Sequence, residues 1–288
     1  MTVKLALGTV QFGIVYGINN KTGRVFEQEA ADIMRRACSA GVDMVDTSRA
    51  YGESEAVLGR TLPSLNAPFK IVSKFIVSPG ATPKGMFADS CGRLRAKGLY
   101  AFLYHRFSDL REHPGWHKEL LDLKAGGSLE KIGFSIYYPA ELRSLIDGGV
   151  KFDLVQLPYS VFDRRFEAML PELKKLGVEV HARSVFLQGL AFMDPAALPA
   201  GLEGMRPKLE RLRGLAEKSG LPVSALCLCF GLLNPCIDRV VIGVDGLADL
   251  EDNLAGAARE NEAKKIYDGL CGLREDDEAL ILPFRWKK

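Results

Sequence analysis

Four ionisable side chains of four different types follow apolar runs in the first part of the chain. Asp46 and Tyr51 lie in "VDTSRAYG", Lys74 in "IVSKF" and His105 in "FLYHRF". A buried lysine needs a partner, because an isolated ammonium in a dry site is very costly, and Asp46 on an adjacent strand can supply the opposite charge. Each residue alone has an ordinary structural explanation, such as a solvated strand end. Their joint occurrence at the ends of three consecutive predicted strands indicates one reactive site.

Short β-branched runs alternate with longer stretches of helical period along the chain. The pattern predicts strands at residues 4–9, 42–47, 69–75, 99–105, 130–137, 152–160, 178–185 and 237–244. Eight strand–helix units predict an α/β fold, a (β/α)8 TIM barrel, whose active site lies at the carboxyl ends of the strands. The alternative is a doubly wound open sheet, which has about five to seven strands and a glycine-rich phosphate turn after the first. "GTVQFG" lacks the G-x-G-x-x-G pattern, and we expect no helix directly after it.

Composition narrows the class of protein. We expect one domain over residues 1–288, with a tail at about 272–288 that could cover the pocket. The formal net charge of +2 and the scattered charged residues predict no binding to nucleic acid or membranes, and closed barrel edges predict a monomer or weak homo-oligomer. No apolar run reaches the roughly 18 residues of a membrane span. The amino terminus lacks signal-peptide features and the cysteines show no C-x-x-C spacing, so we expect a cytoplasmic protein. The four histidines do not gather with carboxylates at strand ends, so we expect no metal.

The stretches "MVDTSRAYGESEAVLG", "IVSKF" and "LYHRFSD", in this order, resemble the aldo-keto reductase family. The resemblance extends from "LALGTVQFG" to "EDNLAGA" and implies a nicotinamide-dependent carbonyl reductase on a (β/α)8 barrel. It implies that Tyr51 is the general acid that protonates the carbonyl oxygen. Lys74 would then lower the pKa of Tyr51, Asp46 would balance the charge of Lys74, and His105 would orient the carbonyl.

The resemblance also implies a coenzyme site. Ser135 and Gln156 match the residues that hold the nicotinamide carboxamide, whereas Ile136 stands where the family has asparagine. Arg183 stands near the position of a stacking aromatic residue, and a planar guanidinium can also stack on a ring. The remaining implied contacts, with the phosphates and the adenosine, are Ser184, Phe186, Leu187, Gln188, Gly189, Ile242, Gly243, Asp252 and Asn253.

Two aspartates bear on the choice between NAD and NADP. Family members that prefer NADP usually place Ser, Lys or Arg near the 2′-phosphate, and this chain has Asp245 and Asp249 at the aligned positions. Two carboxylates would repel a phosphate and can accept hydrogen bonds from a free ribose, which favours NAD. In the alternative, both aspartates point to solvent and a Lys or Arg from elsewhere reaches the phosphate. Asp245 would serve equally well as a helix N-cap.

The sequence says less about the substrate. Candidate contacts are Arg106, which could bind a carboxylate or phosphate, Tyr159 after the sixth strand, and Trp286 in the tail. Mixed aromatic and basic linings suit sugars or small acidic aldehydes. We expect reversible hydride transfer to a small aldehyde or ketone, or from a sugar-like alcohol. The alternatives are redox-neutral sugar chemistry with bound NAD, and a cofactor-binding regulatory protein with vestigial activity.

Overall fold

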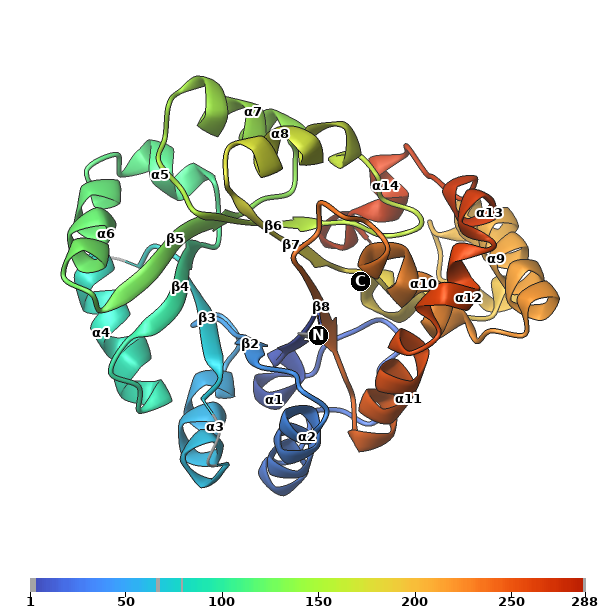
Figure 1. Cartoon of the computed structure of the whole chain (residues 1–288), viewed down its shortest axis with the longest axis horizontal. Coiled ribbons are helices and arrows are strands. Elements are labelled where there is room, and N and C mark those ends of the chain that lie inside the picture. The colour runs from blue at the N-terminus through green and yellow to red at the C-terminus, as the bar shows by residue number, and fades with distance from the viewer. Residues whose placement is uncertain (1–3, 66–67, 79, 287–288) are drawn as a thin grey trace.

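The computed structural model describes residues 4–65, 68–78 and 80–286. Eight parallel strands close into a barrel in chain order, which confirms the predicted (β/α)8 fold (Figure 1). The strands are β1 (Leu5–Gly8), β2 (Met44–Asp46), β3 (Lys70–Phe75), β4 (Leu99–Tyr104), β5 (Leu129–Ser135), β6 (Leu154–Pro158), β7 (Glu179–Arg183) and β8 (Arg239–Gly243). The register between β1 and β8, with Gly8 opposite Gly243, closes the sheet.

Helices form the outer layer of the barrel (Figure 1). The longer ones are α2 (Glu27–Ser39), α3 (Ser54–Thr61), α4 (Pro83–Leu94), α6 (Trp116–Ala125), α7 (Pro139–Asp147), α9 (Arg206–Ser219), α10 (Val223–Leu232) and α11 (Leu247–Ala257). Short helices are α1 (Val10–Gly13), α5 (Ser108–Glu112), α8 (Leu170–Lys175), α12 (Glu260–Lys264), α13 (Tyr267–Cys271) and α14 (Glu278–Ile281). Short 3-10 turns are η1 (Leu62–Ser64), η2 (Glu167–Met169), η3 (Leu187–Phe192), η4 (Pro195–Ala197), η5 (Glu203–Met205) and η6 (Pro283–Arg285).

One expectation about the start of the chain is wrong. Helix α1 begins at Val10, directly after the first strand, where the sequence predicted no helix. It is a single turn of four residues, so it lacks the length of the phosphate-binding helix of an open sheet. The turn is too short to show a helical period in the sequence, which is why pattern analysis missed it.

Apolar spacing explains how the layers pack. In α2 the side chains of Ala30, Ile33, Met34 and Ala37 recur at helical spacing, and all four are buried against the sheet. Inside the barrel, a separate small core is formed by Ala6, Met44, Val72, Ala101, Leu103 and Leu154. Within the described ranges, no single helix combines the length and apolar character needed to cross a membrane, although the bent pair Glu203–Ser219 and Val223–Leu232 meets that test jointly.

Glu179 links several strands at the amino-terminal end of the barrel. Its carboxylate accepts hydrogen bonds from the Tyr100 hydroxyl at 2.6 Å, from His181 Nε2 at 2.7 Å and from the Lys131 ammonium. Burial opposes ionisation, but these donors outweigh it and hold the pKa of Glu179 well below its usual range. This end of a (β/α)8 barrel serves stability rather than chemistry.

We therefore predict that Glu179→Gln destabilises the fold. At pH 7 the loss should be on the order of 3 kcal/mol, because Lys131 keeps a part-buried charge without its partner. The pKa of Glu179 is depressed in the folded state, so its contribution exists above the unfolded pKa of about 4.3 and declines as pH falls below it. Urea denaturation between pH 7 and pH 3.5 should show the two proteins converging in acid.

Glu172→Gln is the matched control, because Glu172 forms an exposed ion pair with Arg143. Exposed pairs contribute little to stability. Equal losses in the two variants, or a gap that does not change with pH, would contradict the role given to Glu179.

Candidate active site

Asp46, Tyr51, Lys74 and His105 come together at the carboxyl ends of β2, β3 and β4, as predicted. The Lys74 ammonium donates to Asp46 Oδ1 at 2.6 Å and to the carbonyl oxygen of Thr47 at 2.8 Å. Lys74 Nζ lies 5.0 Å from the centre of the Tyr51 ring, whose edge meets the His105 ring at a centroid distance of 5.8 Å. The ion pair is buried at the base of the cleft, where Asp46 reaches the lining together with Tyr51 and His105 and Lys74 lies behind it.

The loop between β2 and α3 fixes the position of Tyr51. The Tyr51 amide donates to the Ser48 carbonyl, and the Ser54 amide donates to the Tyr51 carbonyl, both at 3.0 Å. The last residue of α1, Gly13, presses against this loop: a Cβ atom there would lie 1.6 Å from the Tyr51 carbonyl oxygen. Only a residue without a side chain allows this approach.

Ser48 is a member of the site that sequence reasoning missed. Its buried hydroxyl lies 2.9 Å from His105 Nδ1 and 3.2 Å from the Lys74 carbonyl oxygen. The hydroxyl has one proton: when Ser48 donates it to Nδ1, the His105 proton lies on Nε2, and when Ser48 donates it to the Lys74 carbonyl, the Nδ1–H of His105 donates to Ser48. The available signal was its place in "VDTSRAYG", two residues after Asp46.

The local electrostatics give His105 and Tyr51 their protonation states. Burial, then the charges of Lys74 and Arg183, lower the pKa of His105 to about 3, so its ring is neutral at pH 7. Burial and the Asp46 carboxylate raise the pKa of Tyr51, whereas Arg183 lowers it. This rise is opposite to the expectation that Lys74 lowers the pKa of Tyr51. The ammonium of Lys74 is already paired with Asp46, and burial also lowers its own pKa.

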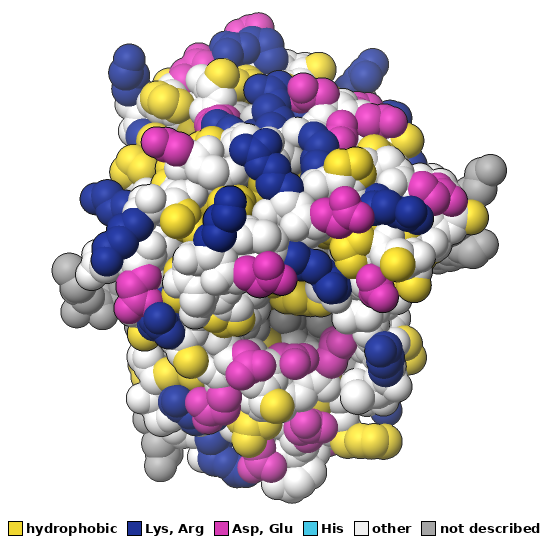
Figure 2. Space-filling model, turned by 90° about the vertical axis from the view of Figure 1, so that its right-hand side faces the viewer, with side chains coloured by type: hydrophobic (Ala, Val, Ile, Leu, Met, Phe, Trp, Pro, Cys, Tyr) yellow, Lys and Arg dark blue, Asp and Glu magenta, His cyan; other side chains and the backbone are white. Residues whose placement is uncertain are grey.

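A cleft of about 630 Å³ extends from these residues toward α11. The space-filling view shows a hollow on the side that carries α9 and α11, with Asp and Glu side chains gathered at its edge (Figure 2). The predicted residues that line the cleft are Asp46, Tyr51, His105, Ser135, Gln156, Arg183, Ser184, Phe186, Gln188, Gly189, Gly243, Asp245, Asp249, Asp252 and Asn253. Leu187 and Ile242 are buried and do not line it, so their side chains belong to the core.

Of the substrate contacts predicted from sequence, Tyr159 is contradicted by its burial, and Arg106 and Trp286 lie outside the cleft lining. Tyr159 is fully buried, donates to Glu167 at 2.8 Å and stacks on Phe230, because it follows β6 on the outward-facing side. Arg106 is exposed and lies outside the cleft lining. Trp286 also lies outside it, with its indole N–H bonded to the Leu280 carbonyl at 3.2 Å.

Two residues expected near nicotinamide already have protein partners. Gln156 Nε2 donates to Asp46 Oδ2 at 2.7 Å, which leaves the amide oxygen of Gln156 for another contact. The Arg183 guanidinium lies 4.1 Å from the centre of the Tyr137 ring and donates to the Ile136 carbonyl at 3.0 Å. Tyr137 lines the cleft and was not predicted.

The loop after α1 supplies a further wall of the cleft that the sequence did not predict. Tyr16, Asn19, Asn20, Lys21 and Thr22 line it, as does Gln11. This loop meets the β7 loop, where Gln188 Nε2 donates to the Tyr16 hydroxyl at 2.9 Å. The only signal was the Gly- and Asn-rich run "YGINNKTG", which indicates a loop but not where it lies.

The end of the cleft beside β8 is built around Gln11 and Asp245. Gln11 Nε2 donates to Asp245 Oδ1 at 3.2 Å, and the Asp245 amide donates to Asp249 Oδ2 at 2.9 Å. Gln11 Oε1 is buried and has no hydrogen-bond partner within the described part of the chain. Such an atom indicates a polar group still to be bound, because buried polar atoms are normally satisfied.

Comparisons with known proteins agree with this architecture. A model of the Aldo/keto reductase family matches residues 4–266. L-galactose dehydrogenase of Arabidopsis thaliana is 27% identical over 279 residues, 87% of this chain and 84% of that protein. An uncharacterized oxidoreductase of Mycobacterium tuberculosis is 25% identical over 289 residues, 91% of this chain and 86% of that protein.

Solved structures show the same fold. An aldo-keto reductase from Bacillus halodurans in its holo form superposes with a TM-score of 0.70 at 19% identity, covering 91% of each chain. A mutant of Gox0644 in complex with NADPH superposes with a TM-score of 0.71 at 19% identity, covering 95% of this chain and 90% of that one.

Proposed function

From the premise that this chain belongs to the aldo-keto reductase family of oxidoreductases, we propose that Tyr51 is its general acid and base. The substrate would be a small aldehyde or ketone, or a sugar-like alcohol in the reverse direction. The observation that carries the proposal is the convergence of Tyr51 and His105 on one cleft, above the buried Lys74–Asp46 pair.

The cleft fits a nicotinamide dinucleotide. Ser135 and the free amide oxygen of Gln156 would hold the carboxamide at one end. The unpartnered Gln11 Oε1 lies near Gly243, where a side chain would collide with Gln11. The N-cap residue of helix α11 makes no side-chain bond, but the Leu247 amide already donates to the Glu29 carboxylate at 3.3 Å, so a phosphate would use the later amide groups of the first turn. The coenzyme, when bound, supplies or accepts the hydride.

The residues of the chain manage the proton and the carbonyl oxygen. Because the pKa of Tyr51 is raised, its hydroxyl keeps its proton at neutral pH and can give it to the oxygen. With its proton on Nε2, neutral His105 would donate a second hydrogen bond to the same oxygen, which requires the Ser48 hydroxyl to donate to Nδ1 rather than to the Lys74 carbonyl. Lys74, 5.0 Å from the ring, would attract the phenolate that remains, with Asp46 holding the ammonium in place.

Absorbance at 340 nm tests this proposal directly. The protein is mixed with NADH or NADPH and a panel of short aldehydes, ketones and aldoses, and in reverse with NAD or NADP and sugar lactols. Oxidation of the coenzyme by a carbonyl compound supports it. Tight binding of NAD with sugar conversion but no change at 340 nm would indicate redox-neutral chemistry. Binding without any turnover would indicate a regulatory role.

We also propose that the coenzyme is NAD rather than NADP. Asp245 and Asp249 both line the cleft, and Gln11 holds the Asp245 carboxylate in it. Burial and the charge of Asp249 raise the pKa of Asp245, although the hydrogen bond from Gln11 opposes this. Lys21 lines the same cleft and is the cation through which a 2′-phosphate would be accepted instead.

Replacing Asp245 with serine should weaken this preference. We expect the ratio of the NADPH to the NADH dissociation constant to fall roughly tenfold, because about 1.4 kcal/mol of charge repulsion is removed. Quenching of tryptophan fluorescence measures both constants. Glu251→Gln is the control, because Glu251 is on α11 but outside the cleft lining. Tighter binding of NADPH by the wild type, lost in Lys21→Met, would contradict the NAD preference.

A further inference from the structure

Arg183 is a cation in the cleft without a carboxylate partner among residues 4–65, 68–78 and 80–286. Its guanidinium donates to the Ile136 carbonyl at 3.0 Å and to Ser184 Oγ at 3.3 Å, and both acceptors are neutral. Arg183 is partly buried, and removing a charged group from water without an opposite charge is costly. The guanidinium therefore has unused capacity to bind an anion.

Arg183 lies at the end of the cleft where Tyr51 and His105 would hold the substrate carbonyl, so an anion bound by Arg183 would lie there too. Arg183 lines the same cleft as Tyr51 and His105. Burial raises the pKa of Tyr51 and lowers that of His105, and the charge of Arg183 lowers both, so it opposes burial at Tyr51 and adds to it at His105. Lys74 and Asp46 neutralise each other, and His105 is uncharged at pH 7. Among the described residues that line the cleft around Tyr51 and His105, Arg183 is thus the cation without an opposite charge, while Arg106 acts on His105 from outside the lining.

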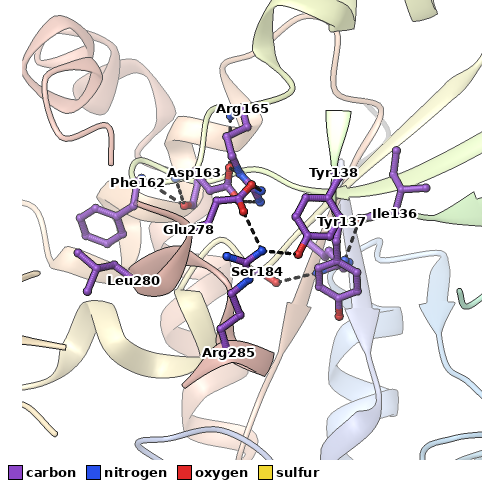
Figure 3. Close-up of polar contacts among 12 residues, drawn as sticks. Ile136, Tyr137, Tyr138, Phe162, Asp163, Arg165, Ser184, Glu278, Leu280 and Arg285 are labelled. Atoms are coloured by element: carbon purple, nitrogen blue, oxygen red, sulfur yellow. Dashed lines mark hydrogen bonds and ion pairs between the residues drawn. The ribbon is translucent and has the colours of Figure 1, made fainter. Parts of the chain in front are cut away.

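Residues of the carboxyl-terminal segment pack against the Tyr137 ring, on which the Arg183 guanidinium stacks. One side of the Tyr137 ring faces Arg183, and Phe284 packs edge-on against the ring at a centroid distance of 4.8 Å. The neighbouring Tyr138 hydroxyl accepts a hydrogen bond from Arg285 Nη2 at 2.9 Å (Figure 3).

An ion-pair chain fastens this segment to the loop after β6. Arg285 pairs with Glu278 at 2.9 Å, Glu278 with Arg165 at 3.0 Å, and Arg165 with Asp163 at 2.8 Å (Figure 3). Asp163 and Arg165 are both largely buried, so this chain is anchored in the protein. A guanidinium stacked on such a fixed ring is pre-organised, and little side-chain entropy is lost when it binds a ligand.

We propose that Arg183 binds a carboxylate of the substrate, so that the preferred substrates are aldehydes or ketones that carry an acidic group. This rests on the proposed reductase function and names its substrate class. A planar guanidinium matches a carboxylate with two parallel hydrogen bonds, which places the carbonyl as well as attracting the charge. The competing role, stacking on the nicotinamide ring, has to use the face of the guanidinium opposite Tyr137.

Matched pairs of aldehydes separate the two roles. The probes are 4-carboxybenzaldehyde against its methyl ester, and 4-oxobutanoate against butanal. For the wild type we expect kcat/KM to be at least about tenfold higher on the acids. Arg183→Gln should lower kcat/KM about a hundredfold on the acids, the loss typical of a charged hydrogen-bonded pair, and less than about threefold on the neutral partners.

Two further variants serve as controls. Arg183→Lys keeps the positive charge but loses the planar guanidinium with its two parallel donors. Its activity on the acids should therefore lie between that of Arg183→Gln and that of the wild type. Arg106→Gln removes an exposed cation that acts on His105 from outside the cleft lining, and should show no preference between the acids and their neutral partners. The dissociation constant of the coenzyme should be unchanged in Arg183→Gln.

Equal losses on acids and neutral aldehydes, together with weaker coenzyme binding, would overturn the proposal and assign Arg183 to the coenzyme. A selective loss in Arg106→Gln would overturn it too. If the wild type reduces no aldehyde, the proposed reductase function is rejected independently of the anion site. The anion site is then judged by terephthalate, which should raise the Tm of the wild type but not that of Arg183→Gln; a rise in both, or in neither, rejects it.

Discussion

Replacing Tyr51 with phenylalanine is expected to lower kcat for carbonyl reduction about a thousandfold while leaving the affinity for coenzyme unchanged. Loss of a positioned general acid typically costs two to four orders of magnitude. The ring of phenylalanine fills the same space beside His105, so the edge-to-face contact at 5.8 Å remains and only the proton donor is removed. Single-turnover measurements at 340 nm, with coenzyme binding followed by fluorescence, separate the two quantities.

Tyr104→Phe is the matched control for this experiment. Tyr104 is adjacent to His105 and fully buried, and its hydroxyl has no hydrogen-bond partner within the described ranges. Its ring stacks on Phe134, outside the cleft. This variant should keep nearly full activity. If Tyr51→Phe keeps more than about a tenth of the wild-type kcat, another group supplies the proton.

Replacing Lys74 with methionine should reduce both stability and activity. Lys74 is fully buried, so the variant leaves the Asp46 carboxylate without its ammonium, although Gln156 still donates to it. Removing one partner of a buried pair costs about 3–5 kcal/mol. Because Lys74 is also the cation nearest the Tyr51 ring, we expect kcat to fall at least about a hundredfold.

A double variant distinguishes the two effects. Combining Lys74→Met with Asp46→Asn removes both charges, so much of the lost stability should return in urea denaturation. Activity should not return, because no cation remains beneath Tyr51. Recovery of activity together with stability would mean that Lys74 acts only by holding the fold, which would remove it from the proposed mechanism.

The barrel and the four central residues could be predicted because their signals are periodic. Each strand appears as a short apolar run, and parallel strands bring their carboxyl ends to one face. Asp46, Lys74 and His105 follow three such runs, so knowing the strands was sufficient to bring the residues together. The family resemblance then supplied Tyr51, whose loop has no period of its own.

The other features of the site could not be predicted, because they depend on tertiary packing that leaves no local pattern in the sequence. Tyr159 and Trp286 look like pocket residues by type, yet their orientation is set by Phe230 and by the Leu280 carbonyl. The sign of the Tyr51 pKa shift depends on burial and on how Asp46 and Lys74 share their charges. The cleft wall around Tyr16 depends on a loop contact with Gln188, more than 150 residues away in sequence.

Gly13 shows how far the demands of the reaction extend into the chain. It carries no side chain, and its importance comes from the 1.6 Å that would separate a Cβ atom from the Tyr51 carbonyl oxygen. Any other amino acid there must push the Tyr51 loop away from its place above Lys74. In a random mutagenesis screen, substitutions of Gly13 would therefore reduce activity as often as substitutions of Tyr51. The cause would be displacement of Tyr51 and not the loss of a side-chain contact. Whether a position of this protein tolerates substitution depends on the space around its backbone as well as on the reactivity of its side chain.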